Sequence, residues 1–218
     1  MNKLLIIILC SFSFSIQATI PPLSDMYELN NFLNDAKKNK LNDIQIETKL
    51  EQCSKLGNKY CSATLGMHYF RKKDYDKAFN YLIKSDCRFQ TNKGKSYWPS
   101  SQYLGIMYFK GWGVKKDFEN SIKYFKQCVS SGEAECALMM SGVYNELWFK
   151  NHDAVTPFAW LNVAAKMGMT EIPGPKNLNV DIKEAIEFMQ ENLTPEDIKN
   201  GNKLTEELCK TIPKCSQA

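Results

Sequence analysis

Eight cysteines are the residues of this sequence best suited to covalent chemistry, and four of them repeat one spacing. Cys53 and Cys61 form one Cys-x3-Gly-x3-Cys motif, and Cys128 and Cys136 form a second. Two thiols spaced in this way can close a disulfide or contribute to a metal site. The metal alternative fails because no histidine accompanies either pair. The spacing therefore predicts two structural disulfides and no metal ion.

The first 18 residues indicate that these cysteines meet an oxidising environment. Lys3, an apolar run to Phe14 and a small-residue end at Ala18 are typical of a cleaved secretory signal peptide, with cleavage after Ser15 as the alternative. The apolar run is too short to span a bilayer comfortably. Cleavage would remove Cys10 and leave seven cysteines. We therefore expect a periplasmic or secreted protein without membrane insertion.

Three further cysteines lie outside the repeated motif. Cys209 and Cys215 are close together around Pro213, so we expect a third disulfide near the C-terminus. Cys87 is then left as a free thiol. A catalytic role for Cys87 would need a basic partner, and the sequence identifies none.

Other residues that could do chemistry do not form a recognisable active site. Gly94-Lys95-Ser96 has the end of a phosphate-binding loop, but Phe89 stands where the first glycine is required. His68 and His152 lie in different parts of the repeat pattern, and neither a Gly-x-Ser-x-Gly nor a His-Glu-x-x-His motif occurs. We expect no catalytic residues and no cofactor.

Helical repeats must position these residues. One set of landmarks occurs three times: Leu65-Gly66, Tyr69, Asp74 and Tyr81; Leu104-Gly105, Tyr108, Asp117 and Tyr124; and Met140-Ser141, Tyr144, Asp153 and Trp160. Between the last two copies every landmark moves by 36 residues, for example from 105 to 141 and from 117 to 153. A fixed period in the mid-thirties with two helices per unit predicts an all-α fold, an α-solenoid of antiparallel helix pairs.

The repeat pattern also divides the chain. We expect a signal peptide over 1–18, N-terminal capping helices over 24–60, repeats over 61–92, 100–132 and 136–168, and C-terminal capping helices over 176–218. The Cys-x3-Gly-x3-Cys motifs lie where one helix pair ends and the next begins. In the first repeat Ser85 and Ser100 occupy these positions, so no clip is expected there. Residues 170–179 are expected to form a loop.

Residues 104–125 resemble the Sel-one-like repeat, a relative of the tetratricopeptide repeat. They follow the pattern LGxxYxxGxGVxxDxxxAxxYF, with Ser121 where alanine is usual. The resemblance extends over about residues 53–168, and disulfide clips are typical of a cysteine-rich secreted branch that the chain resembles. Some members of that branch carry penicillin-binding or β-lactamase descriptions. Serine acylation of the usual kind requires Ser-x-x-Lys, which this chain lacks.

The first helix of each unit usually lines the concave face of such a solenoid. On the side opposite the packed glycine and tyrosine positions, the sequence places Met67 and Arg71, then Tyr103, Ile106 and Lys110, then Met139 and Glu146. Apolar residues at positions that a helix would normally expose indicate a groove for a partner. Burial of these residues by neighbouring helices is an equally weighted alternative.

We therefore expect an exported, non-catalytic scaffold or adaptor of the cell envelope that binds another protein. One version is an immunity-type inhibitor of a toxin delivered to the periplasm, a role that some exported relatives have. A β-lactam-binding or weakly β-lactam-hydrolysing protein is the alternative. The net charge of +4 is too mild for a nucleic-acid partner. The insertion over residues 88–99 is a second candidate contact surface, and a solvated tether with one packed tryptophan is the alternative for it.

Overall fold

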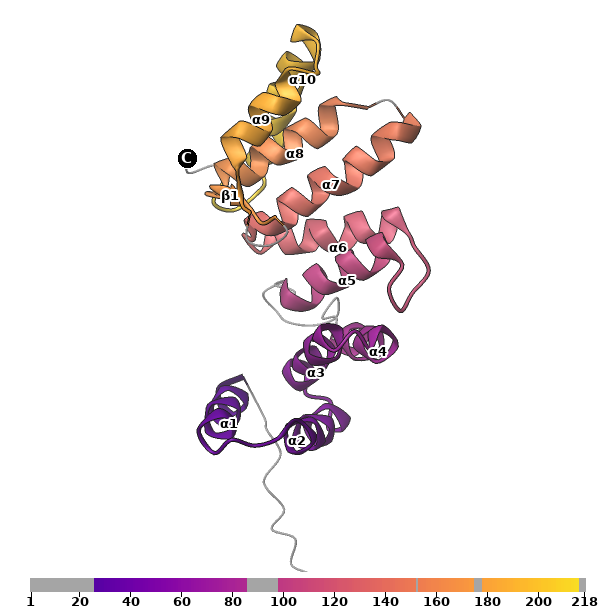
Figure 1. The fold of residues 1–218 in the computed structure, drawn as a ribbon, viewed down its shortest axis with the longest axis vertical. Helices are drawn as coiled ribbons and strands as arrows, with labels where there is room; N and C mark the ends of the chain where they lie inside the picture. Colours follow the sequence, from indigo (N-terminus) through magenta and orange to yellow (C-terminus); the bar gives the residue numbers. More distant parts are fainter. Residues whose placement is uncertain (1–25, 86–97, 152, 175–177, 216–218) are drawn as a thin grey trace, which may run out of the picture.

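The computed structural model describes residues 26–85, 98–151, 153–174 and 178–215. Within these residues, successive helices follow one another along the long axis of the molecule (Figure 1). They are α1 (Met26–Lys38), α2 (Asp43–Lys55), α3 (Lys59–Arg71), α4 (Tyr75–Ser85), α5 (Trp98–Lys110), α6 (Phe118–Ser130), α7 (Ala134–Asn151), α8 (Val155–Lys166), α9 (Ile182–Gln190) and α10 (Pro195–Cys209). The prediction of an all-α solenoid of helix pairs is confirmed.

The expected loop after α8 contains a short strand pairing. Strand β1 (Glu171–Ile172) pairs antiparallel with β2 (Val180–Asp181), and β2 leads directly into α9. The loop prediction for residues 170–179 was therefore wrong at the start of that segment. The signal peptide, Cys87, His152 and most of the 88–99 insertion lie outside the described residues, so the expectations for them stay predictions.

Aspartates begin the second helix of each central pair, as the landmark pattern predicts. The carboxylates of Asp74, Asp117 and Asp153 accept hydrogen bonds from the backbone N–H groups three residues later, at distances of 3.3, 3.0 and 3.0 Å. Such bonds satisfy N–H groups that the first helical turn leaves without an intrahelical partner. The start of each second helix is thus fixed by a local interaction.

The landmark glycines allow the two helices of a pair to approach closely. A Cβ atom added at Gly66 would lie 2.5 Å from Cγ of Leu82, and one added at Gly105 would lie 2.6 Å from Cε1 of Phe125. Both large side chains are fully buried. In the second pair the buried Ser121 hydroxyl also donates to the Gly105 carbonyl oxygen at 2.9 Å. The serine that replaces the usual alanine therefore ties α6 to α5.

The landmark tyrosines stack on each other inside the pairs. Tyr69 of α3 lies parallel to Tyr81 of α4, and Tyr108 of α5 lies parallel to Tyr124 of α6, with ring centroids 5.6 Å apart in both cases. Offset stacking of this kind adds to the stabilisation from burying the rings. The recurrence of tyrosine at these positions in the first two units thus follows from a contact that each of them makes internally.

Replacing Gly105 by alanine should destabilise the protein relative to the same change at Gly142, by about 1–3 kcal/mol. Both glycines lie in first helices, so both variants gain similar helix propensity, about 1 kcal/mol. Only the Gly105 variant forces a methyl group into the Phe125 ring, because nothing lies within 4 Å of a Cβ atom at Gly142. Urea denaturation of the two variants measures the difference. Equal stabilities would contradict a close-approach role for Gly105.

The turn between α5 and α6 packs on the preceding helix pair. A Cβ atom at Gly113 would lie 2.3 Å from the carbonyl oxygen of Tyr75, and Gly113 itself has a φ of +66°. The neighbouring Trp112 stacks on the Tyr75 ring at 4.7 Å and lies 5.9 Å from the Phe70 ring. The Gly-x-Gly-Val motif therefore does more than end a helix, because it also joins one pair to the next.

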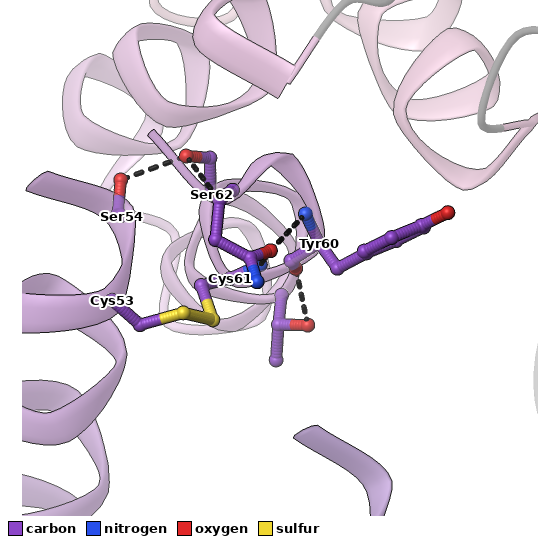
Figure 2. Close-up of a disulfide and its surroundings, with 7 residues drawn as sticks. Cys53, Ser54, Tyr60, Cys61 and Ser62 are labelled. Carbon is purple, nitrogen blue, oxygen red and sulfur yellow. Dashed lines mark hydrogen bonds between the residues drawn. A yellow bond between two sulfur atoms is a disulfide. The ribbon is translucent and has the colours of Figure 1, made fainter. Parts of the chain in front are cut away.

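Three disulfides are present within the described residues, and they are the three pairs predicted from the sequence. Cys53–Cys61 joins α2 to α3 (Figure 2), Cys128–Cys136 joins α6 to α7, and Cys209–Cys215 closes the turn after α10. The first two have the same Cα–Cα separation of 5.9 Å. The glycine between each of these pairs has a positive φ, +85° at Gly57 and +90° at Gly132. Glycine at this position reverses the chain without steric cost.

A hydrogen bond between two serines occupies the equivalent position between α4 and α5. The Oγ atoms of Ser85 and Ser100 lie 2.7 Å apart, and both side chains are buried. Ser85 also donates to the Leu82 carbonyl oxygen at 2.7 Å. The solenoid therefore has three successive junctions of similar design, two covalent and one hydrogen-bonded.

The final helix covers the end of the stack by lying on α8. A Cβ atom at Gly201 of α10 would lie 2.4 Å from the buried Phe158 ring, and the Thr205 hydroxyl lies 3.3 Å from the Ala159 carbonyl oxygen. Beyond α10, the Lys214 ammonium donates to the Gly132 carbonyl oxygen at 3.0 Å. The C-terminal turn is thereby attached to the clip between α6 and α7.

Candidate functional site

The seven residues predicted to bind a partner all lie on the first helices of the three central pairs. Helix α3 carries Met67 and Arg71, α5 carries Tyr103, Ile106 and Lys110, and α7 carries Met139 and Glu146. Helix α5 contacts both α3 and α7. The seven positions therefore belong to three adjacent helices, which we call the first-helix face.

The apolar members of this face are half-buried. Met67 and Tyr103 pack against the N-terminal core cluster, while Ile106 and Met139 pack against the C-terminal one. The Tyr103 ring meets Phe70 edge to face, with centroids 4.7 Å apart. Each side chain therefore packs on its neighbours and keeps some surface exposed, so the burial alternative holds in part and the groove for a partner stays a prediction.

The charged members differ in what surrounds them. Arg71 and Lys110 are exposed, and the Lys110 ammonium lies 4.4 Å from the centroid of the Phe109 ring. Glu146 forms an ion pair with Lys116 from the turn before α6. The carboxylate of Glu146 is therefore already neutralised within the protein, and the exposed charges of the face are positive.

Gly142 is a member of the face that the prediction omitted from its set of contact residues. It lies on α7 between Met139 and Glu146, is exposed, and has nothing within 4 Å of a Cβ atom built on it. An exposed glycine within a helix sacrifices helix propensity. Its position indicates a gap in the side-chain cover of this face.

Comparison with known proteins identifies the architecture. The Sel1 repeat family matches the chain at residues 53–85 and 100–131. The chain is a Sel1-like repeat protein. No curated protein sequence matches it. The crystal structure of c5321, a protective antigen present in uropathogenic Escherichia coli strains, displays an SLR fold and superposes with a TM-score of 0.59 at 19% identity.

That superposition concerns the fold alone. It covers 81% of this chain but 35% of the c5321 chain, so this Sel1-like repeat protein spans about a third of that neighbour. The two matched repeats correspond to the helix pairs α3–α4 and α5–α6, the first extended to include Cys53. Among the described residues, no helix has the length and apolar character needed to cross a membrane.

One group of side chains in this Sel1-like repeat protein has the composition of a metal site. Ligand atoms of Asp43 and Glu47 on α2 and of His68 on α3 lie within 4.8 Å of one another. The Lys72 ammonium lies 2.5 Å from Glu47 and 3.2 Å from Asp43. A cation of the protein itself thus already pairs with both carboxylates. We interpret the group as an ion-pair network that joins α2 to α3.

The sequence did not indicate this network, since Glu47 lies 21 to 25 residues before His68, Tyr69 and Lys72 and these residues belong to no motif. The His68 Nε2 atom lies 2.6 Å from Glu47 Oε1, and the Tyr69 hydroxyl donates to Glu47 Oε2 at 3.2 Å. The hydrogen bond from Lys72 is the largest influence that lowers the pKa of Glu47, from 4.5 to about 2. Burial opposes this shift, and the bonds from His68 and Tyr69 add to it.

Replacing Glu47 by glutamine should cost about 1–2 kcal/mol of stability at pH 7 and almost nothing near pH 2. The folded state holds this carboxyl at a lower pKa than the unfolded chain does. Its contribution is therefore present above about pH 5 and is lost as the pH falls toward 2. The magnitude is well below the full shift because solvent screens a site at the surface. Denaturation of wild type and variant at several pH values measures the difference.

Glu196→Gln is the matched control for that experiment. Glu196 forms an exposed ion pair with Lys199 at 3.8 Å, so its loss should change stability by less than about 0.5 kcal/mol at every pH. A Glu47→Gln penalty that persists undiminished at pH 2 would show that the side chain acts by packing and not by its charge.

Proposed function

We propose that this Sel1-like repeat protein is a non-catalytic scaffold or adaptor of the cell envelope that binds another protein. The observation that carries the proposal is the first-helix face. Three adjacent helices present half-buried Met67, Tyr103, Ile106 and Met139, with exposed Arg71 and Lys110 beside them. A few large apolar anchors combined with charges are typical of binding hot spots.

Three disulfides support an extracytoplasmic location. Structural disulfides persist in the periplasm and outside the cell and are rare in the reducing cytosol. All six bonded cysteines are buried, with exposed fractions of 6% or less. Together with the signal-like sequence over residues 1–18, they favour a periplasmic or secreted protein.

Two forms of the role follow from this location. A general scaffold would bring envelope proteins together, whereas an immunity-type inhibitor would cover the active surface of a toxin delivered to the periplasm. The identity of the bound protein distinguishes them. Capture from envelope extracts followed by mass spectrometry should recover resident envelope proteins in the first case and a toxin in the second.

A steric block on the face provides the test of the proposal. Gly142→Trp places a large side chain on α7 at a position with free space around it, so the fold should be unaffected while partner capture falls at least tenfold. Substituting Tyr103 or Ile106 is less informative, because both side chains also pack on the core clusters.

The control is Lys126→Trp, which places the same side chain at an exposed position on the second helix of the middle unit. This variant should capture the partner as the wild type does. Equal capture by the wild type and the Gly142→Trp variant would show that the partner binds elsewhere. Equal loss in both variants would show that tryptophan at the surface, and not the position, interferes.

A further inference from the structure

A hollow of about 450 Å³ opens beside the first-helix face, where the second central unit meets the third and the C-terminal turn. It is bordered by Gln102 of α5, the turn between α6 and α7, the segment after α8, and Lys214. Gln102 lies on α5 and Glu135 lies on α7, so the hollow is bordered by the starts of two of the three helices that carry that face.

Carboxylates dominate the charge of this hollow. Glu133 and Glu135 line it at the start of α7, and Glu171 lines it from β1. Lys214 is the single cation in the lining, and its ammonium already donates to the Gly132 carbonyl oxygen. The lining therefore carries a net charge of −2 (three carboxylates and one ammonium) on a chain whose net charge is +4.

Two of these carboxylates are held in place by amides and not by cations. The Gln102 side-chain amide donates to Glu135 at 2.8 Å, and the Asn179 side-chain amide donates to Glu171 at 2.7 Å. Among the residues that the structure describes, Glu133, Glu135 and Glu171 form no ion pair. The arrangement orients negative charge without neutralising it.

Two methionines form an adaptable part of the remaining wall. Met167 is almost buried and Met169 is half-buried, and both line the hollow. Methionine side chains conform to varied shapes. A long aliphatic stem that ends in a positive charge matches a hollow with methionines on its wall and carboxylates around it.

A structural role explains only part of this arrangement. Glu133 and Glu135 lie at the start of α7, where carboxylates favourably oppose the helix dipole. Glu171, however, lies on strand β1 and not at a helix start, so the helix dipole does not explain its place in the lining. The convergence of all three carboxylates on one hollow beside the partner face needs another explanation.

We propose that this hollow binds a lysine or arginine side chain of the partner protein, which the first-helix face contacts at the same time. The inference rests on the proposed function and adds the chemistry of the partner. The partner should present a basic residue next to apolar residues, so that the cation enters the hollow while the apolar residues cover Tyr103 and Ile106. Charge complementarity of this kind contributes mainly to specificity and to the rate of association.

Small probes test the hollow without the partner. N-acetyl-arginine methylamide and N-acetyl-lysine methylamide are titrated into the ¹⁵N-labelled mature protein, with the norleucine and glutamate analogues as comparators. Either cation should give saturable amide shifts at residues 132–135 and 167–171, and neither comparator should. Cation-induced shifts spread over acidic residues throughout the surface would overturn the proposal.

Charge-matched variants separate the hollow from general electrostatics. A triple variant should weaken probe binding at least tenfold when it carries Glu133→Gln, Glu135→Gln and Glu171→Gln together. The triple control Glu119→Gln, Glu187→Gln and Glu206→Gln removes the same charge from exposed helical positions and should bind like the wild type. Equal weakening by both triples would overturn the proposal. Glu171→Lys alone should also abolish probe binding. This variant leaves Glu133 and Glu135 at the start of α7 unchanged, so its effect cannot come from altering that helix.

The outcomes also distinguish this inference from the proposed function. Gly142→Trp should block the partner yet leave the small probes bound. If the triple variant at Glu133, Glu135 and Glu171 captures the partner as the wild type does, the hollow is refuted as an anchor for the partner. The proposal for the first-helix face would be unaffected by that result. Probe binding with no partner captured by the wild type would leave the hollow established and refute the scaffold.

Discussion

Replacing Ser85 and Ser100 by cysteine should add a fourth disulfide and raise the free energy of unfolding by about 3 kcal/mol. The two side chains occupy the junction between α4 and α5 at the positions that the Cys53–Cys61 and Cys128–Cys136 clips occupy in the neighbouring junctions. Their oxygen atoms are already 2.7 Å apart. A cross-link that closes a loop of about 15 residues stabilises by roughly this amount in the chain-entropy model.

The measurement combines thiol counting with thermal unfolding. The oxidised double variant should show no additional reactive thiols, and its Tm should rise by about 6–12 °C for a chain of this length. A Cys87→Ala background prevents exchange between Cys87 and the new pair. The single variants Ser85→Cys and Ser100→Cys in the same background are the controls, since each carries one of the substitutions without the bond and keeps the native disulfides oxidised. Free thiols after oxidation would show that the junction cannot adopt disulfide geometry.

Local chemistry explains why so much of the fold could be predicted. The aspartate caps act on N–H groups three residues away, and the positive-φ glycines Gly57 and Gly132 act on their own turn. The first two disulfides close over these same turns, so their repeated spacing identified them, and the closeness of Cys209 and Cys215 in the sequence identified the third. Each feature is decided within a few residues of chain, and repetition of the pattern supplied the order of the helices.

Contacts between units could not be predicted in this way. The sequence assigned the Gly-x-Gly-Val turn to helix termination, whereas the structure also stacks Trp112 on Tyr75 of the preceding pair. Glu47 and His68 meet only because α2 packs on α3, and no periodicity marks them. The hollow brings together residues from α5, α7, β1 and the C-terminal turn. Such arrangements depend on the relative placement of helices, which spacing does not determine.

The first-helix face falls between these two cases. Helical periodicity placed Met67, Tyr103 and Ile106 on one side of their helices, and the structure leaves all three half-buried. Periodicity could not show that the Tyr103 ring also packs against Phe70. Nor could it show that Glu146 is paired with Lys116, a residue 30 positions earlier. Which residues share the first-helix face was therefore predictable, but how much surface each of them leaves exposed was not.

Removing the clip between α6 and α7 is the complementary experiment, and Cys128→Ser with Cys136→Ser should lower the free energy of unfolding by about 2.5 kcal/mol. That is the cost expected for opening a loop of about nine residues. The helical content should be unchanged under native conditions, because the junction between α4 and α5 already holds with a serine pair. Ser130→Ala, an exposed change in the last turn of α6, is the control and should alter stability by less than about 0.5 kcal/mol.

This clip should matter beyond its own loop, because the turn it closes carries Glu133 and receives the Lys214 ammonium at Gly132. Both cysteines are fully buried in the C-terminal core cluster. Hydrogen exchange of the serine variant should therefore rise at residues 131–136 and around the C-terminal turn, and stay at wild-type rates around the Cys53–Cys61 clip. Exchange that rises equally at both clips would show that the solenoid opens as one unit. Wild-type stability in the variant would show that helix packing alone holds the junction closed.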